Sequence, residues 1–360
     1  MPKLTEIAIL TVKGQDYQDW ESVSVKHQYR EMPAFSCRFT CSERSPLSNH
    51  LAKLQIMPGD ECTVTLAGKL AFTGKVTTRQ VFVDARRHHI EIQCANNLKM
   101  AISSVISKTG EWKNKEPEQI IRDVLKPLGI NLKIEGGPLP KFKIPRYSAT
   151  PGESVHDFID VLTRQLGRDS KIGIAHTANV QGDFVILTGP KSGAGDSLIE
   201  GQNMLEGREV IYDPYQAGGV PSPNQGPGTD EQHGSKVSHE PFAGKPFETY
   251  GQKYVPSVVV PEIPYFHKDL LQGRATSESN WVTESYVTVY GTVYGWLRPS
   301  GGLWDVGQYV TVQSPMLVMN NIPLILKSVT FSQDNSTGTR SVLELVNNKA
   351  LGEGVPRPNQ

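Results

Sequence analysis

The sequence predicts a mainly β protein in which two similar β-barrel domains flank a small inserted α+β domain. Three observations favour this fold class. The first hundred residues read as short strands, the next hundred contain two amphipathic helices, and the β pattern returns after a long Pro/Gly-rich stretch. The 360 residues suit two or three domains. Hydrophobic residues make up 38% of the chain, enough apolar material for folded cores.

The first predicted barrel occupies residues 1–100. Its candidate strands often alternate between apolar and polar residues and are separated by Gly, Pro or polar turns, which is typical of barrels and sandwiches. These strands are Glu6–Val12, Ser22–Gln28, Ala34–Thr40, Glu61–Leu66, Leu70–Phe82 and His88–Cys94, with one short helix expected at about Pro46–Leu54.

The inserted α+β domain is predicted at residues 101–205. Glu116–Leu128 and Gly152–Leu166 each carry an apolar stripe at helical spacing. The second helix has a capping residue, a first-turn proline, an N3 carboxylate and a C-cap glycine, which are Thr150, Pro151, Glu153 and Gly167. Two β-like runs follow at Lys171–His176 and Asp183–Thr188.

Residues 206–255 are predicted to form a Pro/Gly-rich arm or linker, densest between Asp213 and Tyr254, because such a composition cannot build a core. The second barrel is expected at residues 256–350, followed by a flexible tail at 351–360. Its candidate elements are a helix near Lys268–Asn280 and strands at Ser285–Trp296, Tyr309–Gln313, Leu324–Ser332 and Arg340–Asn347.

Aromatic residues gather on one face of the predicted strand Ser285–Trp296. Tyr286, Tyr290, Tyr294 and Trp296 alternate with valines. Tyr and Trp are enriched at protein interfaces, which makes these four residues a candidate subunit interface. The same pattern would suit a strand covered by the helix near 268–280, and a strand pattern alone does not separate the two alternatives.

The two β regions resemble each other, which indicates an internal duplication. Three segments match in the same order: Gly59–Val64 with Gly307–Val312, Val76–Gln80 with Val329–Gln333, and Ile90–Ile92 with Leu343–Leu345. Two equivalent barrels per chain would give three chains six quasi-equivalent units around one axis.

Several segments together carry a family resemblance over nearly the whole chain. They are Trp20–Val25, Phe35–Thr40, Ile90–Asn97, Ser148–Val155 with its helix through Gly167, Tyr290–Gly291, Gly307–Val310, Val329 and Leu343–Val346. On these residues the sequence resembles the gp44-type baseplate hub proteins of Mu-like phages. These belong to a wider group with the T4 hub protein, the P2 D protein and the N-terminal part of VgrG.

The resemblance implies a non-enzymatic structural subunit of a contractile phage tail. It implies a homotrimer whose tube-like barrels form a pseudo-hexameric ring between the sixfold tail tube and the threefold central spike. The expected partners are the spike, the tail tube or a tape-measure-proximal tail protein, and neighbouring baseplate proteins. DNA would pass through the lumen transiently, without specific binding. The expected location is the virion tail baseplate, after assembly in the host cytoplasm.

Composition disfavours two other classes of protein. Lys+Arg and Asp+Glu both number 37, so the chain lacks the basic surplus of a typical duplex-DNA binder. No apolar run approaches 18 residues, so no membrane insertion is expected. Met1–Val12 lacks the features of a signal peptide, which favours a protein that stays in the cytoplasm where it is made or is assembled there into a particle.

Catalytic, cofactor and metal sites are not predicted, because no GxSxG, P-loop, HExxH or dinucleotide motif occurs. His88 and His89 would point to opposite faces of a strand and could not share a metal ion. Glu153 and Asp157, with His156 between them, lie on one helix face. They are the carboxylates that a tail-associated cell-wall hydrolase would need, although a solvated helix face is the favoured interpretation.

A second alternative function is a nucleic-acid-binding barrel protein. Its evidence is two small basic clusters, Arg86-Arg87 and Lys141-Phe142-Lys143, for which solvated turns are the favoured interpretation. The four cysteines, Cys37, Cys41, Cys62 and Cys94, form no CxxC pair and are interpreted as small core residues rather than metal or redox groups.

Overall fold

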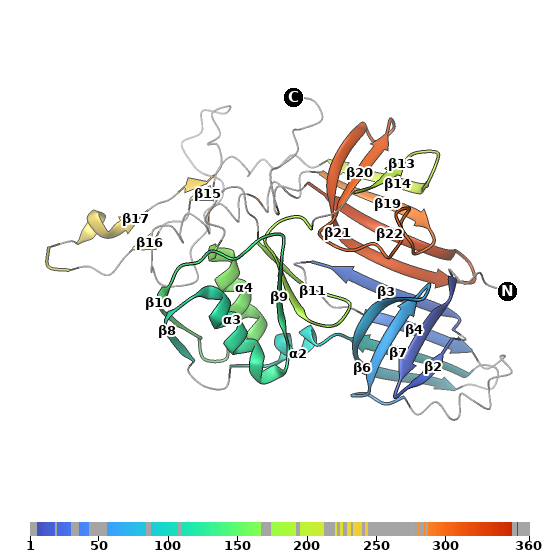
Figure 1. Cartoon of the computed structure of the whole chain (residues 1–360), viewed down its shortest axis with the longest axis horizontal. Coiled ribbons are helices and arrows are strands. Elements are labelled where there is room, and N and C mark those ends of the chain that lie inside the picture. Colours follow the sequence, from blue (N-terminus) through green and yellow to red (C-terminus); the bar gives the residue numbers. More distant parts are fainter. Residues whose placement is uncertain are drawn as a thin grey trace.

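The computed structural model describes most of both barrels and of the inserted domain (Figure 1). The described residues are 6–18, 20–29, 36–42, 56–83, 88–106, 110–166, 174–191, 195–211, 220–221, 224–225, 229–231, 233–239, 242–243, 275, 280, 284, 287–347 and 351. Several predictions lie wholly or mostly outside them: the helices at 46–54 and 268–280, the C-cap Gly167, most of the arm at 206–255, and the tail at 351–360.

The first barrel is built from seven strands. They are β1 (Ala8–Val12), β2 (Gln15–Tyr17), β3 (Ser22–Gln28), β4 (Ser36–Ser42), β5 (Glu61–Leu66), β6 (Lys69–Val83) and β7 (His88–Ala95). In β1, β3 and β5 buried residues alternate with more exposed ones, so these strands bury one face, as in β3, where Val23, Val25 and His27 are buried. The order of neighbouring strands is β3-β4-β7-β6-β5-β1-β2.

The inserted domain packs helices on small sheets. Its elements are α2 (Leu98–Ser103), β8 (Glu111–Lys115), α3 (Pro117–Leu125), η2 (Lys126–Leu128), β9 (Leu132–Glu135), β10 (Ile144–Ser148), α4 (Val155–Leu166), β11 (Ala175–Ala178) and β12 (Phe184–Leu187). The first predicted helix is confirmed, and it ends at Gly129, which adopts φ 67°. The second begins later than predicted. Ser154, rather than Thr150, caps α4, because its Oγ accepts the Asp157 N–H at 3.0 Å.

The second barrel recruits two segments that the sequence pattern assigned elsewhere. Its strands are β13 (Asp196–Ile199), β14 (Met204–Ile211), β19 (Val287–Tyr294), β20 (Tyr309–Ser314), β21 (Met319–Asp334) and β22 (Gly338–Val346). β13 pairs with β20, and β14 pairs with β19. Strand pairing thus places residues 196–211 with the second barrel, rather than with the inserted domain and the arm.

Short elements lie in the described parts of the arm. They are β15 (Val220–Pro221), β16 (Asn224–Gln225), η3 (Gly234–Val237), β17 (Ser238–His239) and β18 (Phe242–Ala243). β15 pairs with β18, and β16 pairs with β17.

The two barrels share one order of strands, with one difference in direction: β1 pairs antiparallel with β5, whereas β13 pairs parallel with β20. Both follow one order of neighbours, β3-β4-β7-β6-β5-β1 in the first and β14-β19-β22-β21-β20-β13 in the second. In each barrel one long strand, β6 or β21, carries a bulge, between Val76 and Thr78 or between Leu326 and Ser328. The duplication predicted from sequence is therefore present in the fold.

Two of the three sequence matches need a shift in alignment. The Gly59 N–H donates to the Val76 carbonyl at 2.8 Å, and the Gly307 N–H donates to the Leu326 carbonyl at the same distance. The match between Gly59 and Gly307 is therefore confirmed, but Val76 corresponds to Leu326 and not to Val329. Arg79 and Val329 hold equivalent places after the two bulges. Since Ile92 pairs with Arg79 and Leu343 pairs with Val329, Ile92 corresponds to Leu343 and not to Leu345.

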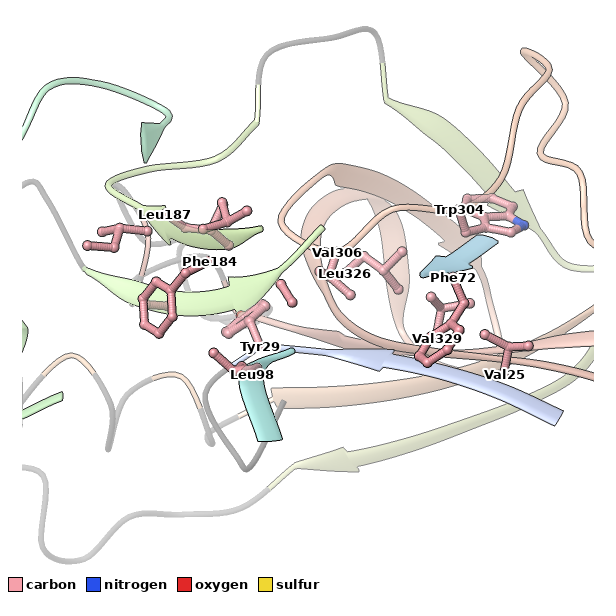
Figure 2. Packing of buried hydrophobic residues seen from close by; sticks show 14 of the residues in the cluster. Val25, Tyr29, Phe72, Leu98, Phe184, Leu187, Trp304, Val306, Leu326 and Val329 are labelled. Carbon is pink, nitrogen blue, oxygen red and sulfur yellow. The ribbon is translucent and has the colours of Figure 1, made fainter. Parts of the chain in front are cut away.

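One apolar core runs through all three domains. Figure 2 shows Val25, Phe72 and Val329 packed together where the barrels meet, with Tyr29 between them and Phe184 of the inserted domain. Polar links fix the same arrangement, since Lys191 Nζ lies 2.7 Å from Asp305 and 3.1 Å from Glu135. The inserted domain is thus packed onto the barrels rather than tethered loosely to them.

Candidate subunit interface

Eight strands form a continuous antiparallel run across the two barrels, in the order β14-β19-β22-β21-β3-β4-β7-β6. The barrels meet where β21 pairs with β3, with Ser328–Asp334 opposite Ser22–Gln28. This junction is called the internal seam. Phe331 and Val25 lie opposite each other in it, and both are fully buried. Each barrel supplies four consecutive strands to the run (Figure 1).

The run ends in two free edges. At one end, β14 pairs with β19 on one side only. At the other end, β5 covers β6 only from Lys69 to Lys75, so the remainder of β6 pairs with β7 alone. No other strand of the described chain pairs with either edge. A long unpaired edge offers backbone N–H and C=O groups to another strand.

Both free edges expose apolar side chains. Val81 and Phe82 on β6 are 42% and 52% exposed, and Val210 and Ile211 on β14 are 37% and 50% exposed. Val81 corresponds to Phe331, which β3 covers completely at the internal seam. The two positions differ because only the internal seam has a neighbouring strand. These edges are therefore the surfaces most suited to binding another β-strand.

The predicted aromatic surface divides into two parts. Tyr290 and Tyr294 are 37% and 61% exposed on the open face of the run, which faces away from the core. Trp296 is fully buried, and its Nε1 donates to the Ser332 carbonyl at 3.2 Å. It leaves the tyrosine face because Gly295, at φ 77°, ends the alternation. Tyr286 lies outside the described residues.

The two exposed tyrosines contact charged groups. The Arg208 guanidinium lies 5.8 Å from the centre of the Tyr290 ring. The Tyr294 hydroxyl donates to the Glu6 carboxylate, which raises the pKa of the tyrosine. A role for Tyr290 and Tyr294 in subunit contact stays a prediction.

Of the two carboxylates that a hydrolase would need, Glu153 has a structural role and Asp157 is largely exposed on α4. Glu153 accepts the Thr150 N–H at 2.8 Å at the turn before α4. His156, next to Asp157, lies with its Nε2 2.9 Å from Nε2 of His176. His176 is almost fully buried, so this pair lies between α4 and β11 and not in an open cleft.

The remaining candidates give no cluster of ligands. Cys62 and Cys94 are buried thiols, and a hydrogen bond with Cys94 together with burial raises the pKa of Cys62. They correspond to Val310 and Leu345 of the second barrel, which supports their interpretation as core residues.

Several candidates fall partly or wholly outside the described side chains: Cys37, Cys41, His88 and Arg86-Arg87. His89 is half-buried on β7, and Lys141 and Lys143 lie on an exposed loop. Within the described part of the chain, no three His, Cys, Asp or Glu side chains gather as a metal site would require. None of its helices is both long and apolar enough to cross a membrane.

Comparison with known proteins agrees with this architecture. Residues 7–95 match the family described as Mu phage baseplate assembly protein GpP-like, N-terminal, and residues 99–187 match the second domain of gp44-like baseplate hub proteins. Baseplate hub protein gp44 of Escherichia phage Mu is 24% identical over 95% of this chain and 88% of its own length. These matches make the chain similar to the Mu-type baseplate hub proteins over most of its length.

Solved structures extend this likeness at the level of the fold. The 43 kDa tail protein of prophage MuSo2 from Shewanella oneidensis has a TM-score of 0.78 at 21% identity, covering 96% of this chain and 99% of the tail protein. The c3393 protein of E. coli has a TM-score of 0.58 at 9% identity, covering 96% and 79%. That protein is described as a type VI secretion component similar to the T4 tail proteins gp27 and gp5. The predicted family resemblance is confirmed.

Proposed function

We propose that this chain is a baseplate hub protein, a non-enzymatic structural subunit that forms a homotrimeric ring in the virion tail baseplate. The observation that carries the proposal is the run of eight antiparallel strands with a free edge at each end. Because eight is even, the first and last strands point in opposite directions. A β6 edge can therefore meet the β14 edge of the next copy in antiparallel pairing, like every other pair in the run.

Closure by three copies would give a sheet of twenty-four strands with no free edge, three times the run in one chain. The junction between copies would repeat the internal seam, because β6 corresponds to β21 and β14 corresponds to β3. It would also cover Val81 and Ile211, which are half exposed in the single chain. Apolar burial of this kind favours association.

The ring would suit a symmetry adaptor. Three chains present threefold symmetry through their inserted domains and arms, and near-sixfold symmetry through their barrels. The sixfold tail tube, or a tail protein near the tape measure, would dock on the barrels, and the threefold central spike on the opposite side, with other baseplate proteins around them. The T4 tail proteins named in the description of the c3393 protein support this context.

The open face of the run would line a conduit through which DNA passes without specific binding. Side chains of both signs occur on this face, including Arg208, Arg340 and Glu344. The whole chain has a formal net charge of zero. A lumen of mixed charge would hold DNA weakly, because tight binding depends on a basic surplus.

Native mass spectrometry and electron microscopy of the purified chain test the proposal. A trimer with a central hole and six-lobed outline is expected. The variant Phe82→Asp places a charge on the β6 edge and is expected to reduce the trimer, whereas Lys141→Asp, on an exposed loop away from both edges, serves as the matched control. A monomer at high protein concentration, with no ring in micrographs, would overturn the proposal.

A further inference from the structure

Two charged side chains of opposite sign stand on the two free edges, and each has a buried polar atom without a hydrogen-bond partner. They are Nε of Arg79 on β6 and Oε1 of Glu209 on β14. No side-chain hydrogen bond or ion pair joins either residue to another within the described part of the chain. Buried charged groups are rarely left unpaired, because the loss of hydration is then not offset.

The internal seam predicts which residues would face each other between copies. The bulges align β6 with β21, so that Arg79 corresponds to Val329 and Val81 to Phe331. The pairing through β19 and β22 aligns Glu209 with Val25.

In the internal seam Phe331 lies opposite Val25, and Val329 lies opposite His27. Transferred to the junction between copies, this register sets Val81 opposite Glu209 and Arg79 opposite Ile211. All four side chains then lie on the face that points to the core.

We propose that the copies of this hub chain pair β6 with β14 in this register, and that Arg79 forms an ion pair with Glu209 of the partner subunit. The inference rests on the ring proposed above and adds its register and its charged contact. Arg79 and Glu209 would be diagonal neighbours, a position that long side chains reach across about 7–8 Å. The guanidinium would then satisfy the carboxylate that the single chain leaves unpaired.

The charged pair would also distinguish one seam from the other. The internal seam has Val25 and Val329 where the junction between copies has Glu209 and Arg79. β3 already pairs with β21 and β4, so β14 is the edge left for β6 of another copy. There Glu209 would give Arg79 a charged partner, which Val25 at the corresponding position of the internal seam could not.

The same register also predicts a contact on the open face of the junction. The proposed register sets Phe82, which is 52% exposed, opposite Arg208. The Arg208 guanidinium already lies over the Tyr290 ring. Phe82 of one copy could thus cover the other side of that guanidinium, an arrangement that cation–π attraction favours.

Charge reversal tests the ion pair in the full-length chain. Arg79→Glu and Glu209→Arg are each expected to weaken the trimer at least about thirtyfold in native mass spectrometry, because each places two like charges at the seam. The double variant, with both reversals, is expected to recover most of the affinity. Arg122→Glu, in the exposed Arg122–Glu118 pair on α3, is the matched control and should leave the trimer unchanged. Circular dichroism of each variant confirms that it folds.

Cysteine crosslinking tests the register while keeping Arg79 and Glu209. Gln80→Cys with Val210→Cys sets two thiols directly opposite, within the Cα range that a disulfide spans. Mild oxidation should link chains into covalent trimers on a non-reducing gel. Gln80→Cys with Ile211→Cys points the thiols to opposite faces and should not. The unsubstituted chain controls for the native cysteines.

The outcomes separate the two proposals. A wild-type chain that stays monomeric overturns the ring itself. A wild-type trimer that tolerates both charge reversals, or that crosslinks only through the offset pair, overturns the register and the ion pair but leaves the ring standing. Loss in both single variants without recovery in the double variant also overturns the ion pair.

Discussion

Acidification should destabilise the folded chain through one histidine at the internal seam. His27 on β3 is fully buried, its Nε2 lies 2.8 Å from the Ala71 carbonyl, and its ring meets Phe331 edge-on at 5.7 Å. Burial lowers the pKa of His27 from 6.5 to about 4, with Lys191 adding to the effect and Asp305 opposing it. The neutral ring is therefore the form that the fold accepts.

The sign and size follow from the two pKa values. The pKa is lower in the folded chain than in the unfolded chain, so the stabilisation is fully present above pH 6.5 and is lost as the pH falls from 6.5 towards 4. The difference corresponds to about 3 kcal/mol. His27→Gln keeps an N–H donor for the Ala71 carbonyl but does not titrate.

Urea unfolding from pH 7.5 to 4, at one protein concentration, measures the effect. The wild-type chain should lose about 3 kcal/mol more than His27→Gln over this range. Groups other than His27 titrate alike in both proteins, so their contributions cancel. Parallel pH curves for the two proteins would refute the assignment of a buried neutral histidine at the seam.

Three further predictions concern packing, chemistry and assembly. Gly74→Ala should lower the free energy of unfolding by at least about 2 kcal/mol in thermal denaturation, because a Cβ there would lie 2.3 Å from the Ala95 carbonyl oxygen; an unchanged Tm would contradict the packing. Glu153→Gln should leave the result of a cell-wall zymogram the same as for the wild type. It should change the free energy of unfolding by less than about 1 kcal/mol, since a glutamine oxygen can still accept the Thr150 N–H. Burial raises the pKa of Glu209 in the single chain, and an ion pair would lower it in the trimer, so trimer stabilisation should be full above the single-chain pKa and lost as pH falls. Native mass spectra recorded at a series of falling pH values should show less trimer in the wild type at low pH, whereas the trimer fraction of Glu209→Gln should not change for this reason.

The parts of the fold that a single strand or helix encodes could be predicted from sequence. Alternation in β3 and the apolar stripe of α3 report burial directly. Gly59 and Gly307 were matched correctly because both need a positive φ, 98° and 85°, that glycine adopts most easily.

Features that depend on a neighbour could not be predicted. Each bulge shifts the phase of alternation by one residue, so Val76 before one bulge was matched with Val329 after the other. β14 was divided between the inserted domain and the arm at residue 205, because its sequence shows no apolar alternation. In the structure Leu205–Arg208 is exposed, and Glu209 takes the place of a core valine. The strand lacks the apolar alternation of a covered strand, which fits an edge whose cover comes from another copy.

The internal seam has a consequence for how a ring is assembled. Because β21 and β3 belong to one chain, the six barrels arrive as three docked pairs, and two association steps build the ring rather than the five that six separate barrels would need. Each avoided encounter spares a loss of translational and rotational freedom worth about 4–15 kcal/mol. A ring made this way has three covalently linked joints that never open and three that can, so any widening of the hub during ejection would follow a threefold pattern.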